Sequence, residues 1–264
     1  MLTSAATLQG YVISGTDGEI GQVDRLFFDD EKWVVRHLVV DTGKWLPGRR
    51  VLISPAAVER VDPDRGCIHL NLTREVIRNS PDVDTDKPVS RQQEIALNDY
   101  YGYGPYWGTG GLYGAFYYPP GIVPPGALAA PAVPAAPGRV APGQTQDSGD
   151  DSHLRSTKEV SGYHVHAEDG SIGHIDGFLI EDDTWAIRYL VIDTSNWPGG
   201  ESVLISPRWV REVDWTRSRV YVNATVDKVR SSPKYDPSGI LDRRAEESLD
   251  RHYGQPHYPD KEGS

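Results

Sequence analysis

The sequence has almost no cysteine, no long apolar run and no excess of basic residues. Cys67 is the only cysteine, which excludes a disulfide within the chain and zinc sites built from several cysteines. No stretch approaches the ~20 apolar residues that a membrane-spanning helix needs. Residues 121–137 are apolar but carry repeated prolines, which a helix interior does not tolerate. We therefore expect no transmembrane segment.

The charge balance is acidic, with 27 Lys and Arg against 38 Asp and Glu and a net charge of −11. Proteins that bind nucleic acid usually show a basic face, because neutralising phosphates releases counterions. Nucleic acid is therefore not an expected partner. The apolar run near the N-terminus is too short for a signal peptide, and no basic region precedes it. We expect a cytoplasmic protein, which could lie at the periphery of a membrane complex.

The clearest positive feature is an internal repeat. The segment Gly10-Tyr-Val-Ile-Ser-Gly-Thr-Asp-Gly-Glu-Ile-Gly-Gln-Val-Asp24 recurs at 162–176, so that an offset of 152 aligns the two halves. The same offset aligns Leu52-Ile-Ser-Pro55 with Leu204-Ile-Ser-Pro207. Self-similarity at a fixed separation is the signature of a duplicated unit. We predict one domain at residues 5–102 (the first copy) and another at residues 158–254 (the second copy).

Within each copy, short β-rich segments alternate with Gly, Pro and Asp turns. The predicted strands of the first copy are Tyr11–Ser14, Gly21–Asp29, Trp33–Val40, Val51–Ser54, Val58–Val61 and Cys67–Leu72. Short helices are predicted at Arg74–Arg78, capped by Thr73, and from Ser90 to Tyr101. This pattern predicts an all-β protein made of two small β-barrels with short C-terminal helices. A unit of this size buries only about 60% of its unfolded surface, so the barrels could pack together or form a homodimer.

A segment rich in Tyr, Gly, Pro and Ala separates the copies. Residues 103–157 cannot bury enough apolar surface to offset their ordering entropy, and we interpret them as a flexible linker. Residues 255–264 are interpreted as a disordered tail. Tyr106 and Trp107 are nevertheless candidates for protein binding, because a plain linker does not need large aromatic side chains.

No set of residues resembles a catalytic site. The chain has neither a Gly-x-Ser-x-Gly motif nor a phosphate-binding loop, and Cys67 has no obvious base nearby in the sequence. We therefore predict a protein that is not an enzyme and that needs no cofactor.

Repeated carboxylates and a group of histidines are candidate ligands for a cation or a metal ion. Asp24 and Asp41 recur as Asp176 and Asp193 and could bind a cation, but we interpret them as acceptors for backbone groups or for an arginine at strand ends. Candidate arginine partners are Arg36 and Arg188. We assign no metal site; the candidate ligands, if one exists, are His164, His166 and His174, which a hairpin could bring together.

Tryptophans in loops are further candidates for protein binding. Trp45 and its counterpart Trp197 lie in Pro- and Gly-containing loops. The alternative interpretation places them in the core or at the barrel rim.

Both copies resemble the PRC-barrel family. The resemblance rests on the Gly-Tyr…Asp-Gly…Gly-x-Val/Ile-Asp hairpin, the Trp-x-Val/Ile-Arg strand that ends in Asp-Thr, and the Val-Leu-Ile-Ser-Pro strand. It covers about residues 5–102 and 157–254, and Leu97-Asn-Asp-Tyr-Tyr-Gly102 resembles the tail of bacterial tandem PRC-barrel proteins. The resemblance implies a small β-barrel that acts as an adaptor, as in the cytoplasmic domain of the photosynthetic reaction-centre H subunit and in a ribosome-maturation factor.

These observations support a non-enzymatic adaptor or assembly module that binds protein partners. One alternative is a subunit associated with a reaction centre or another electron-transfer complex. Another is a ribosome or RNA maturation factor, which the acidic charge disfavours.

Overall fold

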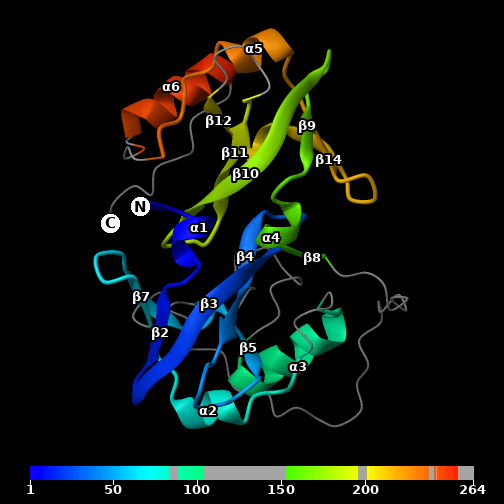
Figure 1. The fold of residues 1–264 in the computed structure, drawn as a ribbon. Coiled ribbons are helices and arrows are strands. Elements are labelled where there is room, and N and C mark those ends of the chain that lie inside the picture. The colour runs from blue at the N-terminus through cyan, green and yellow to red at the C-terminus, as the bar shows by residue number, and fades with distance from the viewer. Residues whose placement is uncertain (84–88, 104–152, 196–200, 238–240, 242, 255–264) are drawn as a thin grey trace, which may run out of the picture. The chain divides into compact units, whose positions relative to one another are not determined.

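The computed structural model describes residues 1–83, 89–103, 153–195, 201–237, 241 and 243–254 (Figure 1). The described chain is mostly β-strand and forms two seven-stranded sheets with few helices. This confirms the expected all-β class and the duplication at the level of the sheets.

The first sheet is built mainly from the first copy. Its strands are β2 (Val12–Gly15), β3 (Gly18–Asp29), β4 (Val34–Asp41), β5 (Arg50–Ile53), β6 (Val58–Asp62) and β7 (Cys67–Leu70). They lie in the order β5-β4-β3-β2-β7-β6. β2 and β7 pair in parallel, with Ile13 opposite Ile68, and both of these side chains are fully buried.

The second sheet repeats this order with the second copy. Its strands are β9 (His164–His166), β10 (Ser171–Glu181), β11 (Ile187–Asp193), β12 (Ser202–Ile205), β13 (Val210–Asp214) and β14 (Arg219–Val222). They lie in the order β12-β11-β10-β9-β14-β13. Because equivalent strands occupy equivalent places, the repeat in the sequence is a repeat of topology.

Each described strand order is an open path and not the closed barrel that we expected. The break falls between β5 and β6 and between β12 and β13, where 3-10 turns intervene at Pro55–Ala57 and Pro207–Trp209. Proline has no N–H to donate to a ladder. The Ser-Pro dipeptide therefore ends one strand and turns the chain before the next begins.

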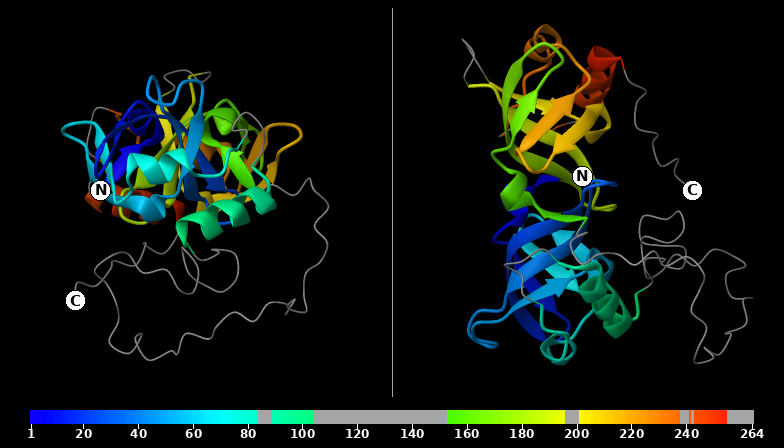
Figure 2. Two further views of the ribbon diagram at one scale, coloured as in Figure 1. Left: turned by 90° about the horizontal axis from the view of Figure 1, so that it is seen from below. Right: turned by 90° about the vertical axis from the view of Figure 1, so that its right-hand side faces the viewer.

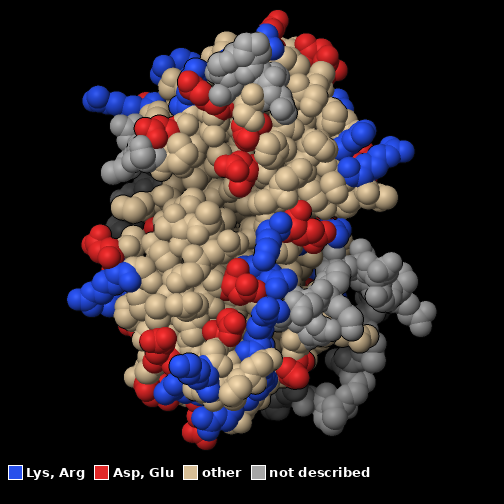
Figure 3. Space-filling model, in the orientation of Figure 1, with Lys and Arg blue, Asp and Glu red and all other residues tan. Residues whose placement is uncertain are grey.

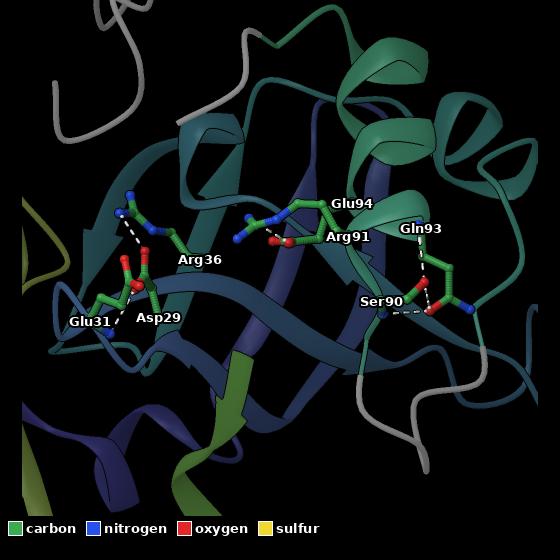
Figure 4. Close-up of polar contacts among 7 residues, drawn as sticks. All are labelled: Asp29, Glu31, Arg36, Ser90, Arg91, Gln93 and Glu94. Carbon is green, nitrogen blue, oxygen red and sulfur yellow. Dashed lines mark hydrogen bonds and ion pairs between the residues drawn. The ribbon is translucent and has the colours of Figure 1, made fainter. Parts of the chain in front are cut away.

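Short helices flank both sheets. They are α1 (Ala5–Leu8), α2 (Arg74–Arg78), α3 (Arg91–Tyr101), α4 (Thr157–Val160), α5 (Val226–Arg230) and α6 (Arg243–Tyr253). The predicted N-caps are confirmed, because the Thr73 hydroxyl accepts from Val76 N and Ser90 forms a capping box with Gln93 (Figure 4). Figures 1 and 2 show α5 (orange) and α6 (red) side by side at one end of the second sheet.

The glycine that opens the second half of each hairpin allows a close approach of two backbones. A Cβ atom on Gly21 would lie 2.0 Å from the carbonyl oxygen of Asp41, and one on Gly173 would lie 1.9 Å from that of Asp193. Only glycine fits here, which explains why this residue recurs in the repeat.

The two copies exchange their leading strands. β1 (Leu2–Ser4), which directly precedes the first copy, pairs antiparallel with β10 of the second, placing Thr3 opposite Ile180. Reciprocally, β8 (Leu154–Ser156) is the seventh strand of the first sheet and pairs with β3. Leu154–Ser156 falls within the predicted linker, but it forms a strand because β3 offers an edge with which it can pair.

A second backbone contact joins the copies at the turns that follow β3 and β10. Val35 N donates to Trp185 O at 2.9 Å, and Ile187 N donates to Trp33 O at 2.8 Å. Trp33 and Trp185 adopt φ values of 54° and 59°, a region that costs non-glycine residues about 1 kcal/mol or more. Trp33 was expected to begin a strand; it is instead the last residue of the turn, and β4 begins at Val34.

Because of these exchanges, the two compact units of the chain do not coincide with the two copies of the repeat. One compact unit comprises Met1–Tyr11, Val23–Leu38 and Arg155–Ser264, and the other comprises Val12–Gln22 and Val39–Leu154. The first unit therefore combines the second copy with parts of β3, β4 and the N-terminus. Its core includes Phe28 and Phe178, which contact each other with ring centroids 5.8 Å apart.

We predict that Gly173→Ala destabilises the protein strongly. The new Cβ would overlap the Asp193 carbonyl oxygen, and overpacking costs about 1–3 kcal/mol, occasionally more; we expect the upper end of that range. Urea unfolding measures the loss. Gly177→Ala in the same strand is the matched control, because no atom lies within 4 Å of its added Cβ. Equal stability of the two variants would contradict the close approach.

We also predict that cutting the chain leaves the two copies associated. A protease site inserted after Gly126 would separate the fragments covalently, yet β1 and β8 each pair with a strand of the other fragment. Size-exclusion chromatography of the cut protein should show one complex. Removing residues 1–4, which include β1, should weaken it. Independent elution of the intact fragments would be incompatible with strand exchange.

Candidate protein-binding surface

The largest apolar side chains exposed in the described chain gather on α2 and α3, apart from Met1. Val76 on α2 and Ile95 and Tyr100 on α3 are 36%, 43% and 39% exposed. The Tyr100 hydroxyl donates to Val76 O at 2.7 Å, which fixes the two helices against each other. Scattered apolar residues are normal on a surface, but Val76 and Tyr100 are in contact with each other, and adjoining exposed apolar groups are typical of an interface.

Trp45 extends this surface. Its indole Nε1 donates to the carbonyl oxygen of Ile20, so the fold holds the ring in the loop after β4. The Arg74 and Arg78 guanidinium groups lie over the ring, 4.9 and 5.7 Å from its centroid. Such distances are typical of cation–π contacts. We call the set Trp45, Arg74, Val76, Arg78, Ile95, Ala96 and Tyr100 the α2–α3 surface.

The second copy has different chemistry at the same positions. Val76 corresponds to Lys228, Ile95 to Glu247, Ala96 to Ser248, Tyr100 to His252 and Arg74 to Val226. The fold is the same in both places, so the first copy does not need these apolar groups to form its helices. The exposed apolar side chains of Val76, Ile95 and Tyr100 are therefore a property of the first copy, whereas Trp45 and Arg78 recur as Trp197 and Arg230.

An ion pair lies within α3, and buried contacts join α6 to the second sheet and to the 3-10 turn at Trp209. In α3, Arg91 pairs with the buried Glu94 at 3.0 Å (Figure 4). In α6, Glu246 accepts from Arg188 at 3.1 Å, and the Tyr253 ring stacks on Trp209 with centroids 4.0 Å apart. Burial raises the pKa of Tyr253 to about 12, although the nearby Ser232 hydroxyl opposes the shift.

Of the four recurring aspartates, Asp41 and Asp193 accept backbone hydrogen bonds at strand ends, whereas Asp24 pairs with its neighbour Arg25 at 2.8 Å. Asp41 accepts from the backbone N–H of Gly43 at 2.8 Å, and Asp193 accepts from Ser195 N at 2.7 Å. This confirms the role predicted for them as backbone acceptors at strand ends.

Arg36 and Arg188 pair with carboxylates other than the four recurring aspartates. Arg36 contacts Asp29 at 3.1 Å (Figure 4), and Arg188 contacts Glu181 at 3.0 Å. Asp29 and Glu181 occupy equivalent positions, but their residue types differ, so a search for identical pairs misses them.

The three histidines are only partly brought together. His174 lies directly opposite His164 across the β9–β10 hairpin, and its Nε2 is 3.6 Å from Asp193. His166 instead stacks on Tyr221, and burial, followed by Arg219 and His164, lowers its pKa. Among the described residues, no group of three or more His, Cys, Asp or Glu side chains could hold a metal ion.

Of the remaining candidate residues, the structure describes one cysteine and leaves three aromatic residues outside the described ranges. Cys67 is half-buried, and burial followed by the charge of Asp62 raises its pKa, which disfavours the thiolate that a nucleophile requires. Trp197, Tyr106 and Trp107 lie outside the described residues.

Comparison with known proteins adds no identification. No family model matches the chain, and no curated protein matches it. In the part of the chain that the structure describes, no helix has the length and apolar character required to cross a membrane.

We predict that Tyr253→Phe reduces the loss of stability in alkali. Tyrosine ionises near pH 10 in an unfolded chain, whereas Tyr253 does so at about 12 in the fold. Its contribution is therefore complete below pH 10 and is lost as pH rises from 10 toward 12. Melting temperatures at pH 9 and 11 should fall less in the variant than in the wild type. An equal fall in both would disprove this role for Tyr253.

Proposed function

We propose that the protein is a non-enzymatic assembly module that binds a protein partner through the α2–α3 surface. One observation carries the proposal: Val76, Ile95 and Tyr100 are exposed in the first copy, whereas their counterparts in the second copy are the polar or charged residues Lys228, Glu247 and His252. The duplicated fold thus provides its own control. An apolar group that the fold does not require, yet exposes to water, is best explained by a partner that covers it.

The residue types fit such a role. Tryptophan, tyrosine and arginine are enriched among the residues that dominate the energetics of protein interfaces, and tryptophan and tyrosine offer a large contact area at a small entropic cost. Trp45 is already held by its hydrogen bond to Ile20, and Tyr100 by its bond to Val76. Binding would therefore require little further ordering of these side chains, which favours affinity.

In this proposal the second copy serves mainly as scaffold. Its α5–α6 surface carries charged or polar residues, including Lys228 and Glu247. Its leading strand β8 completes the first sheet, and β10 receives β1.

The resemblance of both copies to the PRC-barrel family is a second ground for proposing an adaptor role. The repeated sheet order and the hairpin with its required glycine agree with the resemblance seen in the sequence. The family's known roles suggest partners in an electron-transfer complex or a ribosomal particle. Basic residues near Trp45, namely Lys44, Arg49, Arg74 and Arg78, are the one feature that favours RNA. The adjacent apolar side chains favour protein.

The proposal predicts a copy-specific crosslink. A photo-crosslinking amino acid at Ala96 should form a discrete adduct with a partner in cells, whereas the same group at the equivalent Ser248 should not. Excess wild-type protein should compete the adduct away. A variant carrying the second copy's residues, Val76→Lys, Ile95→Glu and Tyr100→His, should compete at least about tenfold less well, because two or more interface hot spots are lost.

The controls separate binding from folding. The three changes are at exposed positions, where substitutions usually alter stability by about 0.5 kcal/mol or less each, and thermal melts would verify this. Lys228→Glu with Glu247→Lys on the second copy should compete like the wild type. Equal adducts from both sites, or none, would reject the proposal. An adduct between two copies of this chain would also reject an adaptor role.

A further inference from the structure

Two arginines on the α2–α3 surface lack a carboxylate partner among the described residues. Arg74 and Arg78 contact Trp45 through their guanidinium groups but form no ion pair within that part of the chain. Arg74 Nε is buried and has no hydrogen-bond acceptor there. An unsatisfied buried donor costs free energy and calls for an explanation.

The chain has many carboxylates with which to pair them. Its net charge is −11, and other arginines do form ion pairs, such as Arg25 with Asp24 at 2.8 Å and Arg155 with Asp30 at 3.0 Å. Arg74 and Arg78, like Arg211 of the second copy, have a guanidinium group over an aromatic ring instead. Their position over an aromatic ring keeps the guanidinium groups ordered while leaving their N–H groups available to a ligand.

The surface has two sides with different chemistry. Arg74 and Arg78 are four residues apart and lie on the same face of α2, toward Trp45. Val76 lies between them in the sequence and contacts Tyr100 on α3. A ligand that covers the whole surface therefore meets cations along one side and apolar groups along the other.

We infer that the partner contributes an amphipathic segment whose apolar side chains cover Val76, Ile95 and Tyr100 and whose carboxylates bind Arg74 and Arg78. This inference rests on the proposed function and specifies the partner's chemistry. Guanidinium groups bind carboxylates through paired hydrogen bonds. Because the two guanidinium groups lie over the Trp45 ring, the acidic edge of the segment faces Trp45.

Binding of defined probes to the full-length chain tests the inference. The first probe is a short fluorescent peptide with a leucine stripe at helical spacing, flanked by glutamates. The second has lysines in place of the glutamates, and the third is a single-stranded oligouridine. Fluorescence anisotropy should show the acidic peptide binding at least about tenfold more tightly than either other probe. Its affinity should fall as salt is added, because exposed charge pairs are screened.

Variants locate the site. Arg74→Gln with Arg78→Gln should weaken the acidic peptide about tenfold or more, as expected for removal of interface arginines. Arg211→Gln is the matched control, because Arg211 lies over the Tyr221 ring of the second copy at 5.7 Å, and it should bind like the wild type. Val76→Lys should weaken both peptides.

Any one of three other results would overturn the inference. Equal binding of the two peptides, stronger binding of oligouridine, or unchanged affinity in the double arginine variant would show that acidic amphipathic segments are not what the surface selects. A positive crosslink at Ala96 with such a result would leave the proposed function standing and reject only the partner chemistry. Loss of both the Ala96 crosslink and the selective binding of the acidic peptide would reject the proposed function as well.

Discussion

The unpaired edge of one long strand in each copy is the constraint on which the structure depends. β10 spans Ser171–Glu181, but its hairpin partner β9 covers only its first few residues. The free backbone groups beyond that point need hydrogen-bond partners. The Gly162–Tyr163 dipeptide satisfies Ile175, and β1 of the other copy then pairs with Leu179–Glu181. The free edge of β3 is paired in the same way, by β8.

This solution ties the two copies together and separates scaffold from surface. Residues shared by both copies, such as Gly21 and Gly173, serve turns, close backbone approaches and the core. Residues that differ can change without loss of the fold. The contrast between Val76, Ile95 and Tyr100 and their counterparts is therefore informative about binding, because both sets occupy the same scaffold.

Much of the fold and little of the surface could be predicted. The strands, the caps at Thr73 and Ser90 and the hairpin glycines follow from local propensity and hydrogen bonding, and the structure confirms them. The α2–α3 surface escaped prediction because its members are distant in sequence and individually ordinary. A sequence signal for these residues nevertheless exists, because Val76, Ile95 and Tyr100 differ in polarity from their counterparts in the second copy. The histidines at 164, 166 and 174 also differ between the copies and are the more conspicuous difference.

The sequence by itself determined the duplication, the all-β class and the order of local elements, since these depend on neighbouring residues and repeated turns. Only the tertiary structure showed that β1 and β8 change places and that Trp45 meets Arg74 and Arg78. The opening Gly-Tyr…Asp-Gly hairpin, read alone, predicts one compact repeat after another. Strand exchange is a choice between equivalent edges, and the two copies offer nearly identical edges, so local sequence cannot decide which edge a strand joins.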